Sequence, residues 1–170
     1  RSLRETGYGG ADESIVSISE KLSKLRASRE VLPQPFTGLS YLDRLFPHRF
    51  KAKTIGLQSF EECWNNDLEM LRAITYLVAD GRSPTAKAVS TNIKFNSFLP
   101  SHFYPSAAAA LVNTYAPRGD VIDPFLGWGG RTLGALCGGA ASICGTDLQS
   151  ESVDGCRRLV HDYSVVRSVD

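Results

Sequence analysis

The chain has 170 residues, with 42% hydrophobic and 22% charged side chains, a composition typical of an ordinary globular protein. This length suits one domain with an extension. No apolar run approaches the ~18 residues of a transmembrane helix and no signal peptide is evident, so we expect no membrane contact. The net charge is +1, but residues 1–60 carry ten Lys or Arg against six Asp or Glu, and residues 61–170 carry nine against twelve. The basic excess of the first third suits either a polyanion or plain solvation.

The cysteines and histidines indicate no metal site. The cysteines are Cys63, Cys137, Cys144 and Cys156, and the histidines are His48, His102 and His161. No Cys-x-x-Cys pair occurs, which argues against zinc, and no nucleophile–histidine constellation is apparent. Two of the cysteines, Cys137 and Cys144, stand in apolar surroundings and are expected to be reduced core residues. We therefore expect an intracellular, reducing compartment, such as cytoplasm or nucleoid.

The first third of the chain predicts helices separated by turns. Residues 1–12 lack periodicity and predict a mobile arm. Residues 14–28 predict an amphipathic helix. Its apolar stripe consists of Ile15, Ile18, Leu22 and Leu25. Prolines break the chain at residues 32–35, and residues 39–46 predict a short helix. Residues 48–53 form a basic turn around one aromatic residue, which either touches phosphate or is solvated.

The next segment predicts two helices joined by a short turn. Residues 67–80 form the first helix, with an apolar stripe facing the core. This stripe consists of Leu68, Leu71, Ile74, Leu77 and Val78. Ser83 and Pro84 are a good N-cap and first residue for the second helix, which runs to about Ile93. One interpretation is a helix-turn-helix that reads DNA; the other is a plain helical hairpin. The DNA contacts would come from Lys87, Ser90, Thr91 and Asn92.

The second half predicts an α/β arrangement. Residues 96–105 form an aromatic loop, and residues 106–115 form a helix of small side chains that can approach a sheet closely. A later helix is expected over residues 151–163, weakened by Gly155. Its inward face consists of Val153, Cys156, Leu159 and Val160. Residues 165–166 are expected to begin a further strand.

Between these helices lies the stretch that carries chemistry. A strand ends in Asp123, a loop follows over residues 124–130, a helix covers residues 132–136, and a second strand over residues 141–146 ends in Asp147. The loop glycines are Gly127, Gly129 and Gly130. Glycine lets the backbone approach a ligand, and the following helix presents free N–H groups.

The spacing of the two acids predicts a cofactor that contains a nucleoside. Asp147 stands 24 positions after Asp123, at the tip of the next strand, where a carboxylate can accept hydrogen bonds from both ribose hydroxyls. Ligands of open α/β sheets lie at the carboxyl ends of the strands. The alternative is a glycine-rich turn with no ligand.

The loop departs from the dinucleotide fingerprint, because Thr132 stands where a third glycine would be. Asp123 would repel a pyrophosphate but suits a cationic methionine group. Residues 123–129, Asp-Pro-Phe-x-Gly-x-Gly, resemble the first motif of S-adenosylmethionine-dependent DNA amino-methyltransferases of the adenine-N6 or cytosine-N4 type. The Gly-Trp-Gly-Gly-Arg variant is similar to a subgroup found in phages and mobile elements. The resemblance covers roughly residues 96–162.

This resemblance implies a partial Rossmann-like methyltransferase sheet in residues 96–170, the half-domain that binds S-adenosylmethionine, preceded by a mainly helical region in residues 1–95. Asp123 would lie near the methionine ammonium group, while Arg131 would meet the methionine carboxylate or support the loop. The implied cofactor-binding residues are Tyr104, Pro105, Asp123, Pro124, Phe125, Gly127, Gly129, Gly130, Asp147 and Leu148. Among these, Asp147 would hold the ribose hydroxyls and Leu148 would pack on the adenine.

The implied reaction is methyl transfer from S-adenosylmethionine to an exocyclic amine of adenine or cytosine in DNA. Such enzymes hold the target amine with a second motif, Asp/Asn/Ser-Pro-Pro-aromatic, whose aromatic ring stacks on the flipped base. The 170 residues contain no Pro-Pro pair. We expect that motif past Asp170 or in a partner subunit, so no catalytic residue is assigned. The alternatives are a catalytically silent cofactor-binding or structural subunit of a nucleic-acid assembly, and a dinucleotide-binding oxidoreductase.

Overall fold

The computed structural model of the protein describes residues 14–28 and 37–167, so the arm expected at residues 1–12 and the chain break expected at residues 32–35 lie outside the described residues. The fold is mixed α/β and mainly helical, with a small two-stranded parallel sheet. The α/β class predicted from the sequence is therefore confirmed at this level.

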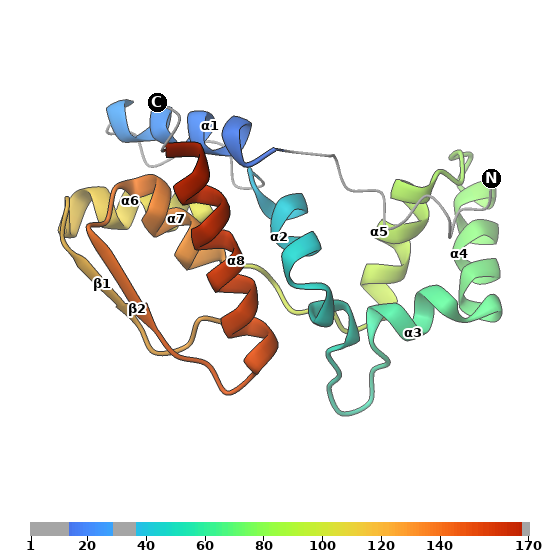
Figure 1. The fold of residues 1–170 in the computed structure, drawn as a ribbon. Coiled ribbons are helices and arrows are strands. Elements are labelled where there is room, and N and C mark those ends of the chain that lie inside the picture. Colours follow the sequence, from blue (N-terminus) through green and yellow to red (C-terminus); the bar gives the residue numbers. More distant parts are fainter. Residues whose placement is uncertain (1–13, 29–36, 168–170) are drawn as a thin grey trace. The chain divides into compact units, whose positions relative to one another are not determined.

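The described residues form two compact units (Figure 1). The sheet unit consists of residues 14–28, 37–46 and 102–167, and the hairpin unit consists of residues 47–101. This division differs from the one expected at residue 95. Residues 37–46 belong with the sheet, because Leu42 and Phe46 are fully buried in its hydrophobic core.

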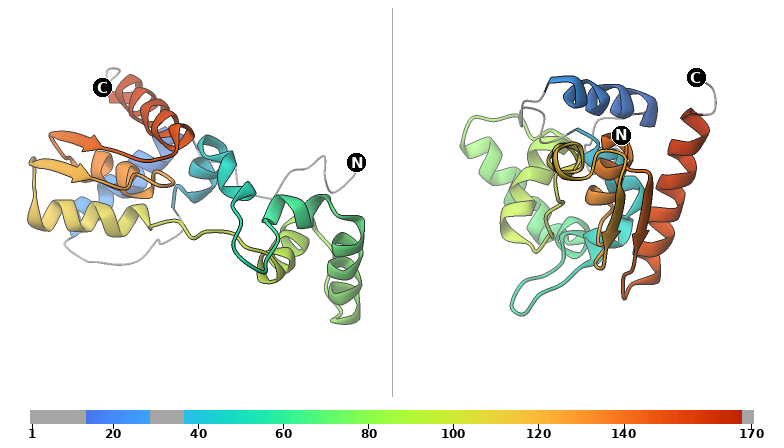
Figure 2. Two further views of the ribbon diagram at one scale, coloured as in Figure 1. Left: turned by 90° about the horizontal axis from the view of Figure 1, so that it is seen from below. Right: turned by 90° about the vertical axis from the view of Figure 1, so that its left-hand side faces the viewer.

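The sheet unit contains most of the predicted elements within a few residues of their expected bounds. They are α1 (Ile15–Ser28), α2 (Leu39–Leu45), α6 (Pro105–Tyr115), β1 (Asp120–Asp123), α7 (Gly130–Gly138), β2 (Ser142–Gly145) and α8 (Ser150–Arg167). The strands lie side by side and run parallel, with Asp123 opposite Gly145 (Figure 2). A parallel pair needs a crossover, and α7 supplies it.

The prediction that residues 165–166 begin a further strand is wrong, because α8 continues through them. The buried face of α8 was also predicted only in part. Cys156 and Leu159 are buried as expected, but Val160 is 39% exposed and Tyr163 takes the next inward position. The Tyr163 hydroxyl donates a hydrogen bond of 2.9 Å to the Leu136 carbonyl, which satisfies it inside the core.

The core of the sheet unit is built by helices. Its described members come from α1, α2, the loop before α7, α7 and α8: Ile18, Tyr41, Leu42, Phe46, Leu126, Leu133, Cys137, Cys156, Leu159 and Tyr163. Leu22 and Leu25, expected to continue the α1 stripe, have side chains outside the described ones. On the strands, Ile122 is 79% exposed. The sheet therefore positions its end residues without supplying apolar side chains to this core.

A face of small residues joins α6 to α7. Gly130, Gly134 and Gly138 recur every four residues, so they share one face of α7. A methyl group on Gly134 would overlap the Pro105 carbonyl and Ala108 of α6, and one on Gly138 would lie 3.1 Å from the Ala109 carbonyl. The helix of small residues was expected to approach the sheet, but its close contact is with α7.

Replacing Gly134 with alanine should therefore destabilise the sheet unit by about 1–3 kcal/mol, the usual cost of forcing an extra methyl group into a packed contact. In a helix without this contact, the same change stabilises by up to about 1 kcal/mol, so the sign is diagnostic. Urea unfolding followed by Trp128 fluorescence, in a Trp64→Phe background, would measure it. The matched change Gly119→Ala meets nothing closer than 3.2 Å and should cost less. A stabilising Gly134→Ala would contradict the α6–α7 contact.

The hairpin unit has its own core around two aromatic rings. Its elements are the 3-10 helix η1 (Pro47–Lys51) and the helices α3 (Phe60–Asn65), α4 (Asp67–Ala79) and α5 (Ala86–Asn96). The rings of Phe60 and Trp64 stack with centroids 5.8 Å apart. Helix α3 was not predicted from the sequence, although Ser59 and Glu62 form a capping box at its start.

The apolar stripe expected on α4 is largely wrong. Leu68, Leu71 and Val78 are each more than half exposed, and the buried side of α4 consists of Met70, Ala73 and Leu77.

Helix α5 begins two residues later than expected. Thr85 is its N-cap, since its side chain accepts a hydrogen bond from the Ala88 amide, while Ser83 and Pro84 stay outside the helix. No helix among the described residues is long and apolar enough to cross a membrane.

The four cysteines are free thiols, and three are buried. The expectation of a core position is confirmed for Cys137 and wrong for Cys144, whose side chain is exposed on β2. Burial raises the pKa of the Cys156 thiol; burial, together with the charge of Glu69, raises that of Cys63.

Alkylation of the native protein with iodoacetamide near pH 8 should therefore modify Cys144 first. The three buried thiols are inaccessible to the reagent, so they should react only after local or global opening. The raised pKa values of Cys63 and Cys156 also lower the fraction of each that is the reactive thiolate. Peptide mass spectrometry over time would give the four rates. Cys144→Ser should remove the fast phase, and a fast phase that persists in this variant would contradict the burial of the other three.

Candidate functional site

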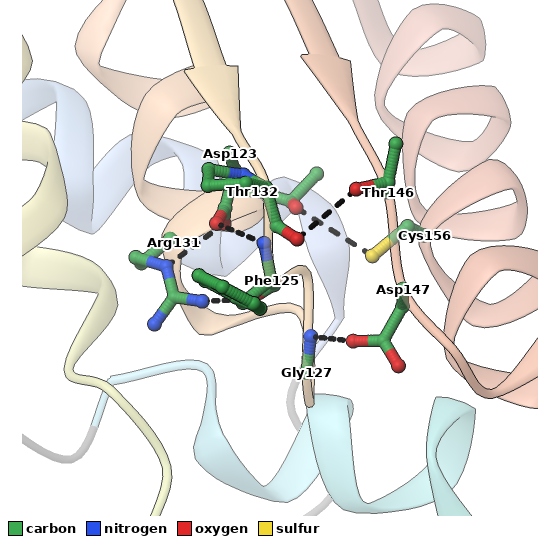
Figure 3. A network of polar contacts seen from close by, with 9 residues as sticks. Asp123, Phe125, Gly127, Arg131, Thr132, Thr146, Asp147 and Cys156 are labelled. Atoms are coloured by element: carbon green, nitrogen blue, oxygen red, sulfur yellow. Dashed lines mark hydrogen bonds and ion pairs between the residues drawn. The ribbon is translucent and has the colours of Figure 1, made fainter.

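The loop of residues 124–129 lies where the carboxyl ends of β1 and β2 meet. The Leu126 amide donates to the Thr146 carbonyl (2.9 Å), and the Thr146 amide donates to the Asp123 carbonyl (3.1 Å). The Thr146 hydroxyl donates to the Pro124 carbonyl at 3.0 Å. These bonds fasten the loop to both strand ends. They also direct Asp123 and Asp147 toward the same loop (Figure 3).

Asp147 closes the loop on the β2 side. One of its oxygens accepts the Gly127 amide at 2.7 Å and the other accepts the Gln149 amide at 2.9 Å. Gly127 has a φ of +57°, a left-handed conformation that glycine adopts without strain. The Asp147 carboxylate is thus oriented by two backbone donors before any ligand arrives.

Asp123 closes the loop on the β1 side and is almost completely buried. One oxygen accepts the Phe125 amide at 3.1 Å, and the other accepts Nε of Arg131 at 2.8 Å. Arg131 also donates from Nη2 to the Phe125 carbonyl, and its guanidinium lies 5.7 Å from the Phe103 ring centroid. The structure therefore gives Arg131 the supporting role, one of the two expected for it. The role toward a methionine carboxylate remains a prediction.

Both carboxylates keep acceptor capacity. An ionised carboxylate offers about four lone-pair positions. The described contacts use two of them on Asp147 and two on Asp123. Asp147 is half-buried and keeps two acceptor positions, as many as a pair of ribose hydroxyls would need. Asp123 keeps as many lone pairs, but only 8% of its side chain is exposed.

Exposed apolar side chains border the loop. Phe125 is 75% exposed, Leu148 is fully exposed, and Tyr104, the N-cap of α6, is 44% exposed. Large apolar groups that lie next to fixed polar groups are the usual lining of a cofactor site. The structure thus places three predicted binding residues at the surface; Phe125 lies in the loop bonded to Asp123, and Leu148 follows Asp147 in the chain.

Other predicted binding residues serve the packing. The side chain of Pro105 is fully buried, and its carbonyl lies against Gly134. A methyl group on Gly130 would overlap the Phe103 carbonyl, and one on Gly129 would lie 2.5 Å from the Phe46 ring. The structure therefore explains these three residues without a ligand.

Two long-range side-chain pairs in the sheet unit were not predicted from the sequence. The Thr132 hydroxyl lies 3.5 Å from Sγ of Cys156, which ties the first turn of α7 to α8. His102 is buried, and its Nε2 lies 2.7 Å from the Asp43 carboxylate. The sequence signal for such long-range pairs is weak, because each partner stands far from the other in the chain. No cluster of three metal-ligating side chains occurs within the described residues.

Comparison with known proteins adds no relative: no family model, no curated protein and no solved structure matches the chain.

The pair formed by Asp123 and Arg131 makes a testable contribution to stability. Arg131→Gln should destabilise the sheet unit by about 1–2 kcal/mol. Removing one partner of a fully buried ion pair costs more than this, but the Arg131 side chain is 40% exposed, so water partly replaces the lost contact. Asp123→Asn combined with Arg131→Gln should cost less than the sum of the single changes, because the two side chains contact each other. Urea unfolding in the Trp64→Phe background measures both.

The control is Arg157→Gln on α8, where an exposed arginine pairs with Asp154 at 3.1 Å. That change should stay within about 0.5 kcal/mol. Equal effects at Arg131 and Arg157 would show that the Asp123 pair contributes no more than a surface contact.

Proposed function

We propose that the β1–α7–β2–α8 segment is part of a Rossmann-like sheet that binds S-adenosylmethionine, and that the protein serves methyl transfer to an exocyclic amine of adenine or cytosine in DNA. The observation that carries this proposal is the pair of carboxylates, Asp123 and Asp147, held on either side of one glycine loop at the ends of adjacent parallel strands. The motif resemblance points to the same cofactor.

The amino-acid end of the cofactor is zwitterionic, and Asp123 with Arg131 offers both signs of charge. The ammonium group would take the acceptor positions that remain on Asp123. The methionine carboxylate would meet the Arg131 guanidinium, which is 40% exposed and has donors beyond those used by Asp123 and Phe125. A pyrophosphate has no group that would favour Asp123.

The nucleoside end would be held at the other acid. Asp147 would accept hydrogen bonds from the ribose hydroxyls through its two remaining positions, and the adenine would cover part of the exposed Leu148 and Phe125. S-adenosylmethionine, when bound, supplies an electrophilic methyl group. The residues of this chain would orient it, and the groups that hold the target amine are not assigned to any of them.

A second candidate function is a cofactor-binding subunit without catalysis of its own. It needs only the cofactor contacts described above, because the 170 residues contain no Pro-Pro pair to hold the target amine. Transfer of a labelled methyl group to unmethylated DNA separates the two functions, because only the first gives labelled base, while both give cofactor binding.

Cofactor binding is tested by calorimetry with S-adenosylmethionine and with its 2′-deoxyribose analogue. The native protein should bind the deoxy analogue roughly ten- to hundredfold more weakly, since hydrogen bonds to a charged group contribute about 1.5–3 kcal/mol. Asp147→Asn should reduce this discrimination. A ratio between two ligands on one variant cancels any loss of affinity that the lost Gly127 contact imposes on both ligands equally.

The matched control is Asp120→Asn, at the opposite end of β1, where the carboxylate accepts a hydrogen bond from the Ser142 hydroxyl at 2.6 Å. It should bind both ligands like the native protein. Binding of NAD in place of S-adenosylmethionine would contradict the cofactor assignment and support the dinucleotide alternative. Undiminished discrimination in Asp147→Asn would contradict the role of Asp147.

A further inference from the structure

The hairpin unit contains a cavity between α4 and α5 that the sequence analysis did not anticipate. Its volume is about 910 Å³, at the upper end of the range of roughly 300–1,000 Å³ seen for ligand clefts. Ala73, Leu77 and Ala88 form part of its lining, and the first two are almost completely buried. The exposed part of the lining is polar and aromatic, so it determines what the cavity can bind.

Three cations line the cavity against one acid. The cations are Arg72, Arg82 and Lys87, and the acid is Glu69. Arg72 pairs with Glu69 at 2.6 Å and Arg82 pairs with Asp80 at 2.7 Å. Both guanidinium groups are more than half exposed, and surface pairs contribute only about 0–1 kcal/mol, so neither arginine is held away from a polyanion in the groove.

Two aromatic rings stand at the same cavity without being buried. Phe95 is 84% exposed and Tyr76 is 55% exposed. The Arg82 guanidinium lies 5.7 Å from the Tyr76 ring centroid, within the distance of a cation–π contact. Rings beside cations in an open groove are the combination by which proteins hold single-stranded nucleic acid, because bases stack on the rings while cations follow the phosphates.

We propose that this cavity binds single-stranded nucleic acid, with bases stacked on Tyr76 and Phe95 and phosphates near Arg72, Arg82 and Lys87. The proposal does not require methyl transfer or cofactor binding by the sheet unit. It replaces the duplex-reading interpretation of α5. Of the side chains expected to read a duplex, Ser90 is buried, and bases inside a duplex cannot reach rings that line a cavity.

An acidic peptide helix is the competing occupant, and the exposed surface fits it less well. A docking helix lays an apolar face into a hydrophobic groove. Here Ala73 and Leu77 are at most 2% exposed. The rings and cations that remain accessible match bases and phosphates more closely than aliphatic side chains.

The test is fluorescence anisotropy with a labelled single strand of about 12 nucleotides, within the usual range of single-strand sites. The native protein should bind the strand, as DNA or RNA, more tightly than the matching duplex. Lys87→Ala with Phe95→Ala should weaken binding at least about tenfold, since one lost stacking contact contributes roughly that factor. It should also lower the slope of log affinity against log salt by about 0.7.

The control pair is Arg158→Ala with Leu111→Ala, which removes one exposed cation and one exposed apolar side chain from the sheet unit, outside both the cavity lining and the basic turn of residues 48–53. It should bind within about twofold of the native protein. Equal losses in both pairs, equal binding of duplex and single strand, or binding of an acidic peptide in place of the oligonucleotide would overturn the proposal.

Should the cavity pair fail to fold by circular dichroism, photo-crosslinking decides with the native protein. A bromouracil-substituted strand should crosslink to peptides containing Tyr76 or Phe95. Crosslinks confined to other peptides would overturn the proposal as firmly as the binding results.

Discussion

The close contact between α6 and α7 is the constraint on which the candidate site depends. Gly130, Gly134 and Gly138 leave no side chain on the shared face of α7, so backbone meets backbone along the contact. At its first position, Gly130 lies against the Phe103 carbonyl, which fixes where α7 begins. Arg131 follows at once, and its guanidinium thereby reaches Asp123 on one side and the Phe103 ring on the other.

A second constraint fixes the other end of the loop. The Phe46 ring is fully buried, and methyl groups on Gly129 and on Gly155 would each lie 2.5 Å from it, at opposite edges. The ring therefore fits between the loop and α8 only because both positions are glycine. This separates the roles of the loop glycines. Gly129 is explained by packing. At Gly127 a methyl group would meet only the Phe125 carbonyl, at an ordinary 3.8 Å, and this residue has a positive φ and an amide bound to Asp147.

The sequence predicted what local patterns determine. Periodicity located most helices, and the strand–loop–helix–strand order placed Asp123 and Asp147 at neighbouring strand ends. It could not show that α4 buries Met70 while Leu68 and Leu71 stay exposed, because periodicity marks an apolar face without choosing among overlapping ones. The division into units was missed for a similar reason: Phe46 is assigned by contacts with residues more than eighty positions away. The spacing of Gly130, Gly134 and Gly138 was readable but was interpreted only as a loop and a helix end.

Asp147 shows how a structural and a binding role can share one side chain. An acid at the end of a strand often caps its own turn, and the bond from the Gln149 amide does this. The Gly127 amide donates to the other oxygen, so an asparagine here would present its NH2 group, a donor, to one of the two amides. The fold thus has its own reason for a carboxylate here. A group that is already oriented loses little freedom when a ligand binds, and for this reason the turn that explains the acid without a ligand also prepares it for one.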